Sequence, residues 1–192
     1  MTAQIQDVFH YRNQPYALAG ISEGELFDVA SLGVAPVPSC SACWRGYQAE
    51  YALRDGRLVL ASLHLSLEGC GPTLHGVKPS RVKAERYDFF NNHYEGLDLP
   101  IAYSGGVLLA DGFLRALYVH MGFHPAWKYE RVIELVFDEG RLTGEHDRSE
   151  RMAELRERFT RTEEVEASPK QMPTREEIRE FVERCFDRRY RM

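Results

Sequence analysis

Residues 47–58 read YQAEYALRDGRL, and this stretch decides the fold because it has the outline of a complete β-hairpin. Alternating apolar and polar side chains are typical of a half-buried strand. The pair Asp55-Gly56 suits the tight primed turn that joins two antiparallel strands. The predicted register then pairs Leu53 with Leu58, Tyr51 with Leu60, and Ala49 with Ser62.

A second stretch, RVIELVFDEGRL at residues 131–142, repeats this pattern, with Glu134 in the place of Glu50 and Gly140 in that of Gly56. Because repeated segments indicate a repeated architecture, we interpret 16–66 and 103–146 as two related halves. Each half is expected to hold a short strand, a brief helical segment and a hairpin. The predicted fold class is therefore α+β, a mostly antiparallel β-sheet built from two related β-α-β-β halves, with C-terminal helices.

The helical segment of each half is predicted from its end signals. Ser22, with Glu25 three residues later, forms a capping box, and Asp111 is the corresponding cap in the second half. Gly33 and Gly122 stand where a left-handed residue would end each helix. Between the halves, a connecting strand is expected at 82–90.

Residues 147–192 are dense in charges of both signs and carry two helical patterns. SERMAELRERF at 149–159 begins with a Ser149 cap and has one apolar stripe. PTREEIREFVERCFDRRYRM at 173–192 has a Thr174 cap and a broader apolar face, as a packed amphipathic helix requires. We expect residues 1–146 to form a single β-rich domain and residues 147–192 to form a helical extension packed on it.

The composition is that of an ordinary soluble globular protein, with 44% hydrophobic and 28% charged residues. A net charge of −5 and a pI near 5.8 give no electrostatic reason to expect nucleic acid or an anionic membrane as a partner. The start of the sequence shows no secretory leader, and no apolar run is long enough for a membrane helix. The expected location is the cytoplasm.

The four cysteines leave three interpretations open. Cys40 and Cys43 have a C-x-x-C spacing, and Cys70 and His75 could complete a tetrahedral zinc site. In a reducing compartment, buried or partly exposed thiols are the more common state, and we favour them over a metal site. A redox pair is the third interpretation, but such a pair usually precedes a helix, whereas a strand follows here.

The candidate catalytic residues are two acids and two histidines. Glu50 and Glu134 occupy matching hairpin positions, where two carboxylates from related halves could meet and one could have a raised pKa. His120 and His124 have a spacing that could hold a metal on a helix, although Gly122 lies between them. For each of these residues, a structural role at the surface or in the sheet is the favoured interpretation.

Two aromatic–basic pairs precede the hairpins: Trp44 beside Arg45, and Trp127 beside Lys128. Such pairs can form a binding patch, or the indole rings can close the end of a sheet core. The sequence has no nucleophile-elbow, Walker A or dinucleotide-binding glycine pattern, so we expect no cofactor.

These observations favour a small binding, interaction or regulatory protein, in the manner of an inhibitor or an immunity protein. We expect a protein partner or a small-molecule ligand, and a homodimer is left open. The alternatives are a hydrolase-type enzyme with a Glu/His cleft between the halves, and a protein with a structural Cys/His zinc site. Of these, an enzyme is less favoured because no catalytic motif is present.

Overall fold

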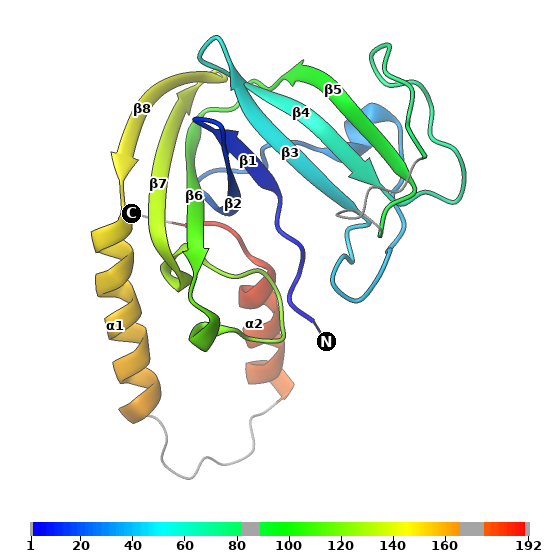
Figure 1. Ribbon diagram of the computed structural model, residues 1–192. Helices are drawn as coiled ribbons and strands as arrows, with labels where there is room; N and C mark the ends of the chain where they lie inside the picture. Colours follow the sequence, from blue (N-terminus) through cyan, green and yellow to red (C-terminus); the bar gives the residue numbers. More distant parts are fainter. Residues whose placement is uncertain (1, 82–88, 166–174, 191–192) are drawn as a thin grey trace.

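The computed structural model describes residues 2–81, 89–165 and 175–190, which form eight strands, two α-helices and short 3-10 turns. The two C-terminal helices lie at one end of the sheet (Figure 1). The strands are β1 (Val8–Tyr11), β2 (Gln14–Ile21), β3 (Tyr47–Arg54), β4 (Arg57–Leu65), β5 (Asn92–Pro100), β6 (Gly105–Phe113), β7 (Tyr129–Asp138) and β8 (Arg141–Asp147). The helices are α1 (Ser149–Val165) and α2 (Arg175–Phe186).

The strands form one mixed sheet in the order β3-β1-β2-β6-β7-β8-β4-β5, and an additional pairing joins β3 to β4. All neighbours are antiparallel except β1 and β3, which run parallel. The sheet is strongly curled, with β6, β7 and β8 on one side and β3, β4 and β5 on the other (Figure 1). The α+β class is therefore confirmed in outline, but β1 separates β2 from β3 whereas β6 lies directly beside β7.

The β3–β4 hairpin has the predicted register near its turn and departs from it further along. Leu53 faces Leu58 and Tyr51 faces Leu60, as expected. A bulge follows at Glu50–Tyr51, so Ala49 faces Leu63, and the predicted pairing with Ser62 is wrong. The bulge adds one residue to β4, which a strict alternation rule cannot foresee.

Both hairpin turns have the predicted primed geometry. Asp55 and Gly56 have φ of 50° and 72°, and Glu139 and Gly140 have φ of 46° and 75°. The turns also meet each other reciprocally, because Leu58 N–H donates to Gly140 O (2.8 Å) and Leu142 N–H donates to Gly56 O (2.9 Å). The ends of the two hairpins thereby hold the curled sheet closed.

The predicted helical segments within the two halves are short 3-10 turns: η1 (Val29–Leu32), η3 (Arg115–Leu117) and η4 (Ala126–Lys128). Asp28, not Ser22, caps η1, and the Ser22 hydroxyl instead accepts from Gly106 N–H (2.7 Å). Gly33 ends η1 in a left-handed conformation, as predicted, whereas η3 ends at Tyr118; Gly122 has the predicted positive φ but does not end a helix.

Apolar side chains gather in two main clusters. The larger fills the inside of the curled sheet, with Phe9, Leu60 and Leu135 fully buried. The smaller lies between α1 and the other face of β6 and β7, and its centre includes Val132 and Met152. Full burial of a methionine contributes about 1.5–3 kcal/mol, so Met152 at 4% exposure anchors α1.

Helix α1 begins at Ser149, as predicted, and continues past the expected end at 159 to Val165. The Ser149 hydroxyl accepts from Val132 N–H (3.0 Å), and Asp147 accepts from the Ser149 N–H (2.8 Å), so Asp147 caps this end of the helix. Two predictions lie partly or wholly outside the described residues: the strand at 82–90 and the Thr174 cap.

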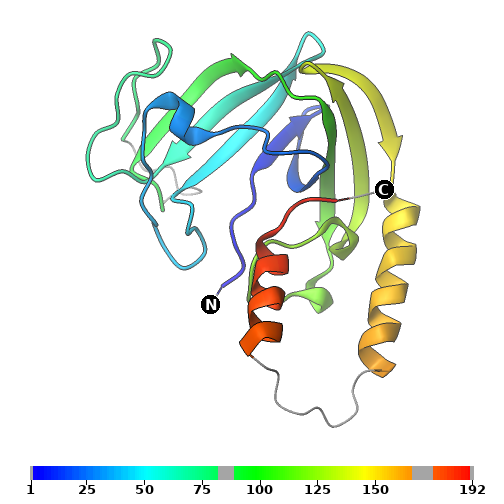
Figure 2. The ribbon, with the colours of Figure 1, turned by 180° about the vertical axis from the view of Figure 1, so that it is seen from behind.

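After α2, residues 187–190 run back across the sheet as an extended segment, which we call the 187–190 segment (Figure 2). β1 pairs with β2 only as far as Val8 and Ala17, which leaves the far end of β2 open on that side. The 187–190 segment occupies this edge, where Ile21 N–H donates to Arg188 O (2.9 Å) and Tyr190 N–H donates to Ile21 O (3.1 Å). Among the described residues, no helix is both long and apolar enough to cross a membrane.

Candidate ligand-binding site

Asp7 joins three segments that are far apart in the sequence. Its carboxylate, only 1% exposed, accepts two hydrogen bonds from Arg45 (2.8 and 2.9 Å) and one from Arg188 (2.8 Å). The backbone N–H of Ala49 in β3 donates to the same carboxylate (2.9 Å). The start of β1, the start of β3 and the 187–190 segment thus meet at one buried acid.

The electrostatics of this cluster favour full ionisation. Burial opposes the charge on Asp7, but the charges of Arg45 and Arg188 and their hydrogen bonds hold the pKa of this carboxyl well below its usual value. Burial also opposes the charge on Arg45, yet Asp7 raises the pKa of that guanidinium. Two cations surround one anion, so the cluster has one positive charge in excess.

Only one nitrogen of the Arg188 guanidinium donates a hydrogen bond to Asp7. Nη1 donates to the carboxylate, and the Cζ atom lies 4.9 Å from the centre of the Phe123 ring. Within the part of the chain that the structure describes, Nε and Nη2 of Arg188 have no acceptor. The side chain is 19% exposed and lines a cavity. A guanidinium fork of this kind matches the geometry of a carboxylate or phosphate.

Arg45 and Arg188 line a hollow of about 570 Å³, which we call the basic hollow. This volume is within the ordinary range of small-molecule sites. Its other walls are aromatic and apolar side chains, with charged groups at the rim. They are Ile21, Gly24, Glu25, Leu26, Phe27, Tyr47, Tyr51, Phe123, Phe186, Asp187 and Arg189.

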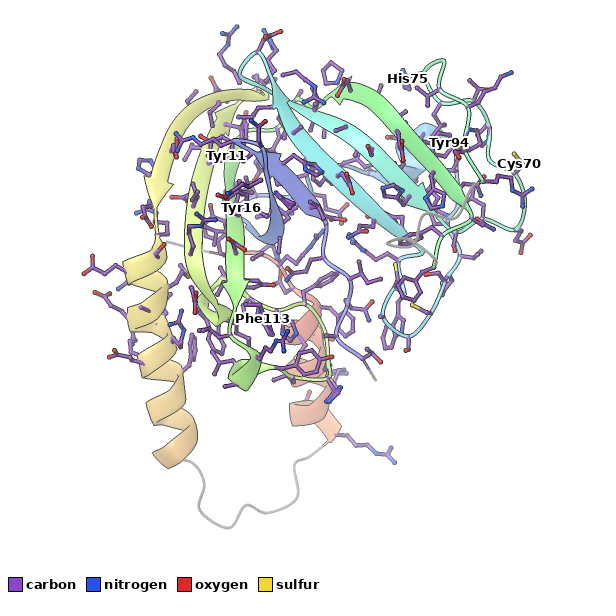
Figure 3. All side chains as sticks on the ribbon, in the orientation of Figure 1. Tyr11, Tyr16, Cys70, His75, Tyr94 and Phe113 are labelled. Atoms are coloured by element: carbon purple, nitrogen blue, oxygen red, sulfur yellow. The ribbon has the colours of Figure 1, made fainter. Side chains whose placement is uncertain are left out.

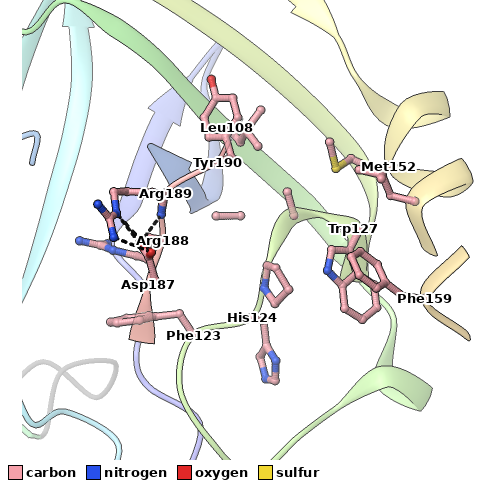
Figure 4. A pocket seen from close by; sticks show the side chains of 14 residues that line it. Leu108, Phe123, His124, Trp127, Met152, Phe159, Asp187, Arg188, Arg189 and Tyr190 are labelled. Atoms are coloured by element: carbon pink, nitrogen blue, oxygen red, sulfur yellow. Dashed lines mark hydrogen bonds and ion pairs between the residues drawn. The ribbon is translucent and has the colours of Figure 1, made fainter. Parts of the chain in front are cut away.

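A second hollow of about 310 Å³, which we call the apolar hollow, lies between α1 and the 187–190 segment (Figure 4). Its lining is mostly apolar. The members are Ala19, Leu108, Phe123, His124, Pro125, Ala126, Trp127, Met152, Leu155, Phe159 and residues 187–190. Phe123 and residues 187–189 line both hollows, so the two cavities adjoin across the 187–190 segment.

Glu134 fixes the far end of this segment. Its carboxylate accepts from Arg148 (2.6 and 2.8 Å) on one oxygen and from the Tyr190 hydroxyl (2.6 Å) on the other. Burial, and then the bond to Glu134, raise the pKa of Tyr190 strongly, so its hydroxyl stays a proton donor. Glu134, a predicted catalytic candidate, therefore holds Tyr190 and with it the 187–190 segment, which separates the two hollows.

Glu50, the matching acid of the first hairpin, has different partners. Its carboxylate lies 2.8 Å from His10 Nε2 and 3.6 Å from His64 Nε2. His64 and His93, opposite each other on β4 and β5, share a hydrogen bond between their Nδ1 atoms (3.0 Å). Burial and His64 lower the pKa of His93. The side chains of Glu50 and Glu134 are thus found in separate polar groups, and Glu50 lines neither hollow.

His120 and His124 do not form a helical pair, since the chain between them contains Gly122 at positive φ. His120 is exposed, with its ring 4.8 Å from that of Tyr118. His124 is buried against Phe113 and Tyr118, with ring centroids at 4.6 and 5.1 Å. Burial lowers the pKa of His124 to about 4, so it is uncharged at neutral pH.

Each aromatic–basic pair places one residue in the lining of a hollow: Arg45 from the first pair and Trp127 from the second. Arg45 lines the basic hollow, while Trp44 is 46% exposed and stacks on Phe186 of α2 (5.2 Å). Trp127 lines the apolar hollow and lies 5.2 Å from the Phe159 ring of α1. Lys128 is buried, with its ammonium 5.2 Å from the Trp127 ring. Each indole therefore contacts one C-terminal helix.

The cysteines are free thiols that differ in exposure. Cys43 is buried and Cys40 is partly exposed; burial raises the pKa of the Cys43 thiol. Cys70 is exposed, and Figure 3 shows it with His75 on the loops beyond β5. Across residues 2–81, 89–165 and 175–190, no group of three or more His, Cys, Asp or Glu side chains is arranged to hold a metal ion.

The sequence did not indicate three residues that matter most here. Asp7 precedes a strand without any motif, and Arg188 is one of several basic residues in DRRYRM. The sequence pattern assigns Tyr190 to the apolar face of a helix, which is wrong because α2 ends at Phe186. Their importance follows from contacts between distant segments. The chain matches no protein-family model, no curated protein and no solved structure.

Proposed function

We propose that this chain is a binding protein whose ligand is a small molecule with an anionic group, held in the basic hollow. The observation that carries the proposal is the guanidinium of Arg188, whose Nε and Nη2 have no acceptor among the described residues while the side chain lines a cavity. Together with Arg45, it provides a positive charge that Asp7 does not fully balance. Charge-assisted hydrogen bonds from such a fork would give affinity and orientation.

The aromatic walls of the basic hollow favour a ligand that has a flat apolar group in addition to its anionic group. Tyr47, Phe27 and Phe123 line the basic hollow, and Arg45 lies over the rings of Tyr47 and Phe123 (4.5 and 5.3 Å). Flat apolar groups pack well on such rings. A carboxylate attached to an aromatic or aliphatic body therefore fits better than a fully hydrated inorganic anion.

The experiment compares benzoate with its uncharged analogue benzamide, using the melting temperature of the protein. Benzoate is expected to raise the melting temperature with the logarithm of its concentration, by the equivalent of about 1.4 kcal/mol at ten times its Kd, whereas benzamide has little effect. Arg188→Gln should weaken benzoate binding at least about tenfold, since a hydrogen bond to a charged group contributes about 1.5–3 kcal/mol.

Arg189→Gln is the matched control, because Arg189 is the neighbouring exposed cation and pairs with Asp187 (2.9 Å). It should leave benzoate binding close to that of the wild type. Equal stabilisation of the wild type and Arg188→Gln by benzoate would exclude the proposed site.

The other functional predictions have less geometric support. A hydrolase cleft requires Glu and His side chains from both halves to converge, whereas Glu50 and Glu134 have separate partners. A protein partner, and with it the inhibitor- or immunity-like role, stays a prediction. The large exposed apolar side chains of the described residues come from three loops and from α1: Trp44, Phe89, Tyr118 with Val119, and Phe159.

We also propose that the two hairpins derive from a duplicated unit. Support comes from the equal turn geometry and from the reciprocal bonds of Leu58 with Gly140 and of Leu142 with Gly56, which relate the hairpins by a local two-fold axis. In this view, both hollows lie where the C-terminal segment crosses the sheet formed by the two units.

A further inference from the structure

The apolar hollow lacks any evident role in holding the fold together, yet it opens beside the proposed anion site. It is formed by the rings of Trp127 and Phe159, the thioether of Met152 and the side chain of Leu108 (Figure 4). Its volume of about 310 Å³ is at the lower end of the range for small-molecule sites.

Arg188 borders this hollow as well as the basic one. The other charged side chains there, Asp187 and Arg189, neutralise each other through contacts of 2.9 to 3.2 Å. Of the charged residues that line this hollow, Arg188 is therefore the one whose guanidinium keeps N–H groups without an acceptor among the described residues. An apolar cavity with one convergent polar group is the usual form of a site for an amphipathic molecule.

We infer that the ligand is an amphipathic monocarboxylate, with its carboxylate on Arg188 and its apolar body in the apolar hollow against Trp127 and Phe159. This inference rests on the proposed function, which assigns the anionic group to Arg188, and it places the body of a longer ligand in the apolar hollow, beyond the aromatic walls of the basic hollow that a short body such as that of benzoate contacts. Burial of the body removes apolar surface from water, so affinity depends on chain length.

The test uses hexanoate and octanoate as probes, benzoate as the reference anion and 1-octanol as the uncharged control. Trp44→Phe leaves Trp127 as the one tryptophan, so its fluorescence reports on the apolar hollow. Each added methylene should tighten binding about fourfold, and octanoate should therefore bind about 15-fold more tightly than hexanoate. 1-Octanol should bind more weakly than octanoate.

Two variants and a control test whether the apolar body of the ligand lies in the apolar hollow. Leu155→Phe fills the hollow and should weaken octanoate at least tenfold while benzoate still stabilises the protein. Phe159→Ala removes a wall that is 47% exposed, and should weaken octanoate without affecting the fold. Glu154→Phe changes the exposed position next to Leu155 and should behave like the wild type.

The outcomes separate the two proposals. If benzoate binds through Arg188 but octanoate is no tighter than hexanoate, or is unaffected by Leu155→Phe and Phe159→Ala, the present inference is overturned and the proposed function stands. If octanoate binds equally to Arg188→Gln, the carboxylate anchor is wrong. If none of the anions binds, both proposals fail.

Discussion

At the scale of single residues, His124 shows how an unremarkable position acquires unusual chemistry. It is 8% exposed, and within the described part of the chain neither ring nitrogen has a hydrogen-bonding partner. Burial, and then the charge of Lys128, lower its pKa to about 4. The sequence places His124 beside Pro125 but cannot show that Phe113 and Tyr118 enclose it, because that requires the fold of β6 and the loop after it.

The expected result is a loss of stability as the pH falls from 6.5 towards 4. An unfolded histidine has a pKa near 6.5, so in this window the unfolded chain binds the proton more readily and unfolding is favoured. His124→Phe removes the group that must be protonated, so its free energy of unfolding should fall less over this window. Urea denaturation at several pH values measures the difference.

His120→Phe is the control for this measurement, since His120 is an exposed ring four residues away. It should keep the pH dependence of the wild type. If His124→Phe and wild-type curves stay parallel between pH 4.5 and 7, the neutral buried state assigned to His124 is wrong.

At the scale of secondary-structure elements, α2 depends on a close backbone contact at Gly122. Phe123 N–H donates to the carbonyl oxygen of Cys185 (2.8 Å), and Gly122 has φ of +63° directly beside that carbonyl. A β-carbon on Gly122 would overlap the Cys185 carbonyl group. The absence of a side chain at this position therefore permits α2 to dock.

Gly122→Ala should displace α2 from the loop that contains Gly122 and Phe123. The amide of Phe123 and those of residues 175–186 would then exchange their hydrogens faster, as hydrogen exchange can measure. Gly33→Ala is the matched control: it has a similar φ of +71° but open space around the new methyl group. It should cost about 1–2 kcal/mol from backbone strain alone and leave α2 protected. Equal protection of α2 in both variants would contradict the docking role.

The sequence predicted well those elements whose structure depends on interactions between residues close together in the chain. Alternation and an Asp-Gly or Glu-Gly turn are enough to predict both hairpins, and a capping pattern with an apolar stripe is enough to locate α1. The bulge at Glu50–Tyr51 and the parallel β1–β3 pairing depend on non-local contacts, so they were missed. The same reason explains why Arg45 was a predicted binding residue while its partners Asp7 and Arg188 were not.

At the scale of the whole molecule, the two hairpin turns close the sheet, but their glycines have different surroundings. Gly140 is buried, and a β-carbon there would overlap the carbonyl oxygen of Ile101. Gly56 has nearly the same φ, is exposed, and has no atom within 4 Å of such a carbon. Two similar stretches of sequence therefore tolerate change differently because the segment between β5 and β6 contacts only the second turn, at Gly140.

Gly56→Ala should cost about 1–2 kcal/mol, the strain of a left-handed alanine. Gly140→Ala should cost more than this, because the overlap with Ile101 is added and the reciprocal bonds with Leu58 must shift. Urea denaturation of the two variants gives the comparison. Equal losses would show that the contact between the hairpin ends does not contribute to stability.

The contact between Asp7 and Arg188 spans 181 positions of the chain, which has a consequence for the order of events during synthesis. A nascent chain that has emerged through β8 contains every strand of the sheet, but its buried carboxylate has only Arg45 as a cationic partner. The closing of so long a loop is entropically slow and depends on segments that are made late. The walls of both hollows are therefore completed last, and a chain that ends before residue 188 would lack the guanidinium on which the proposed binding site depends.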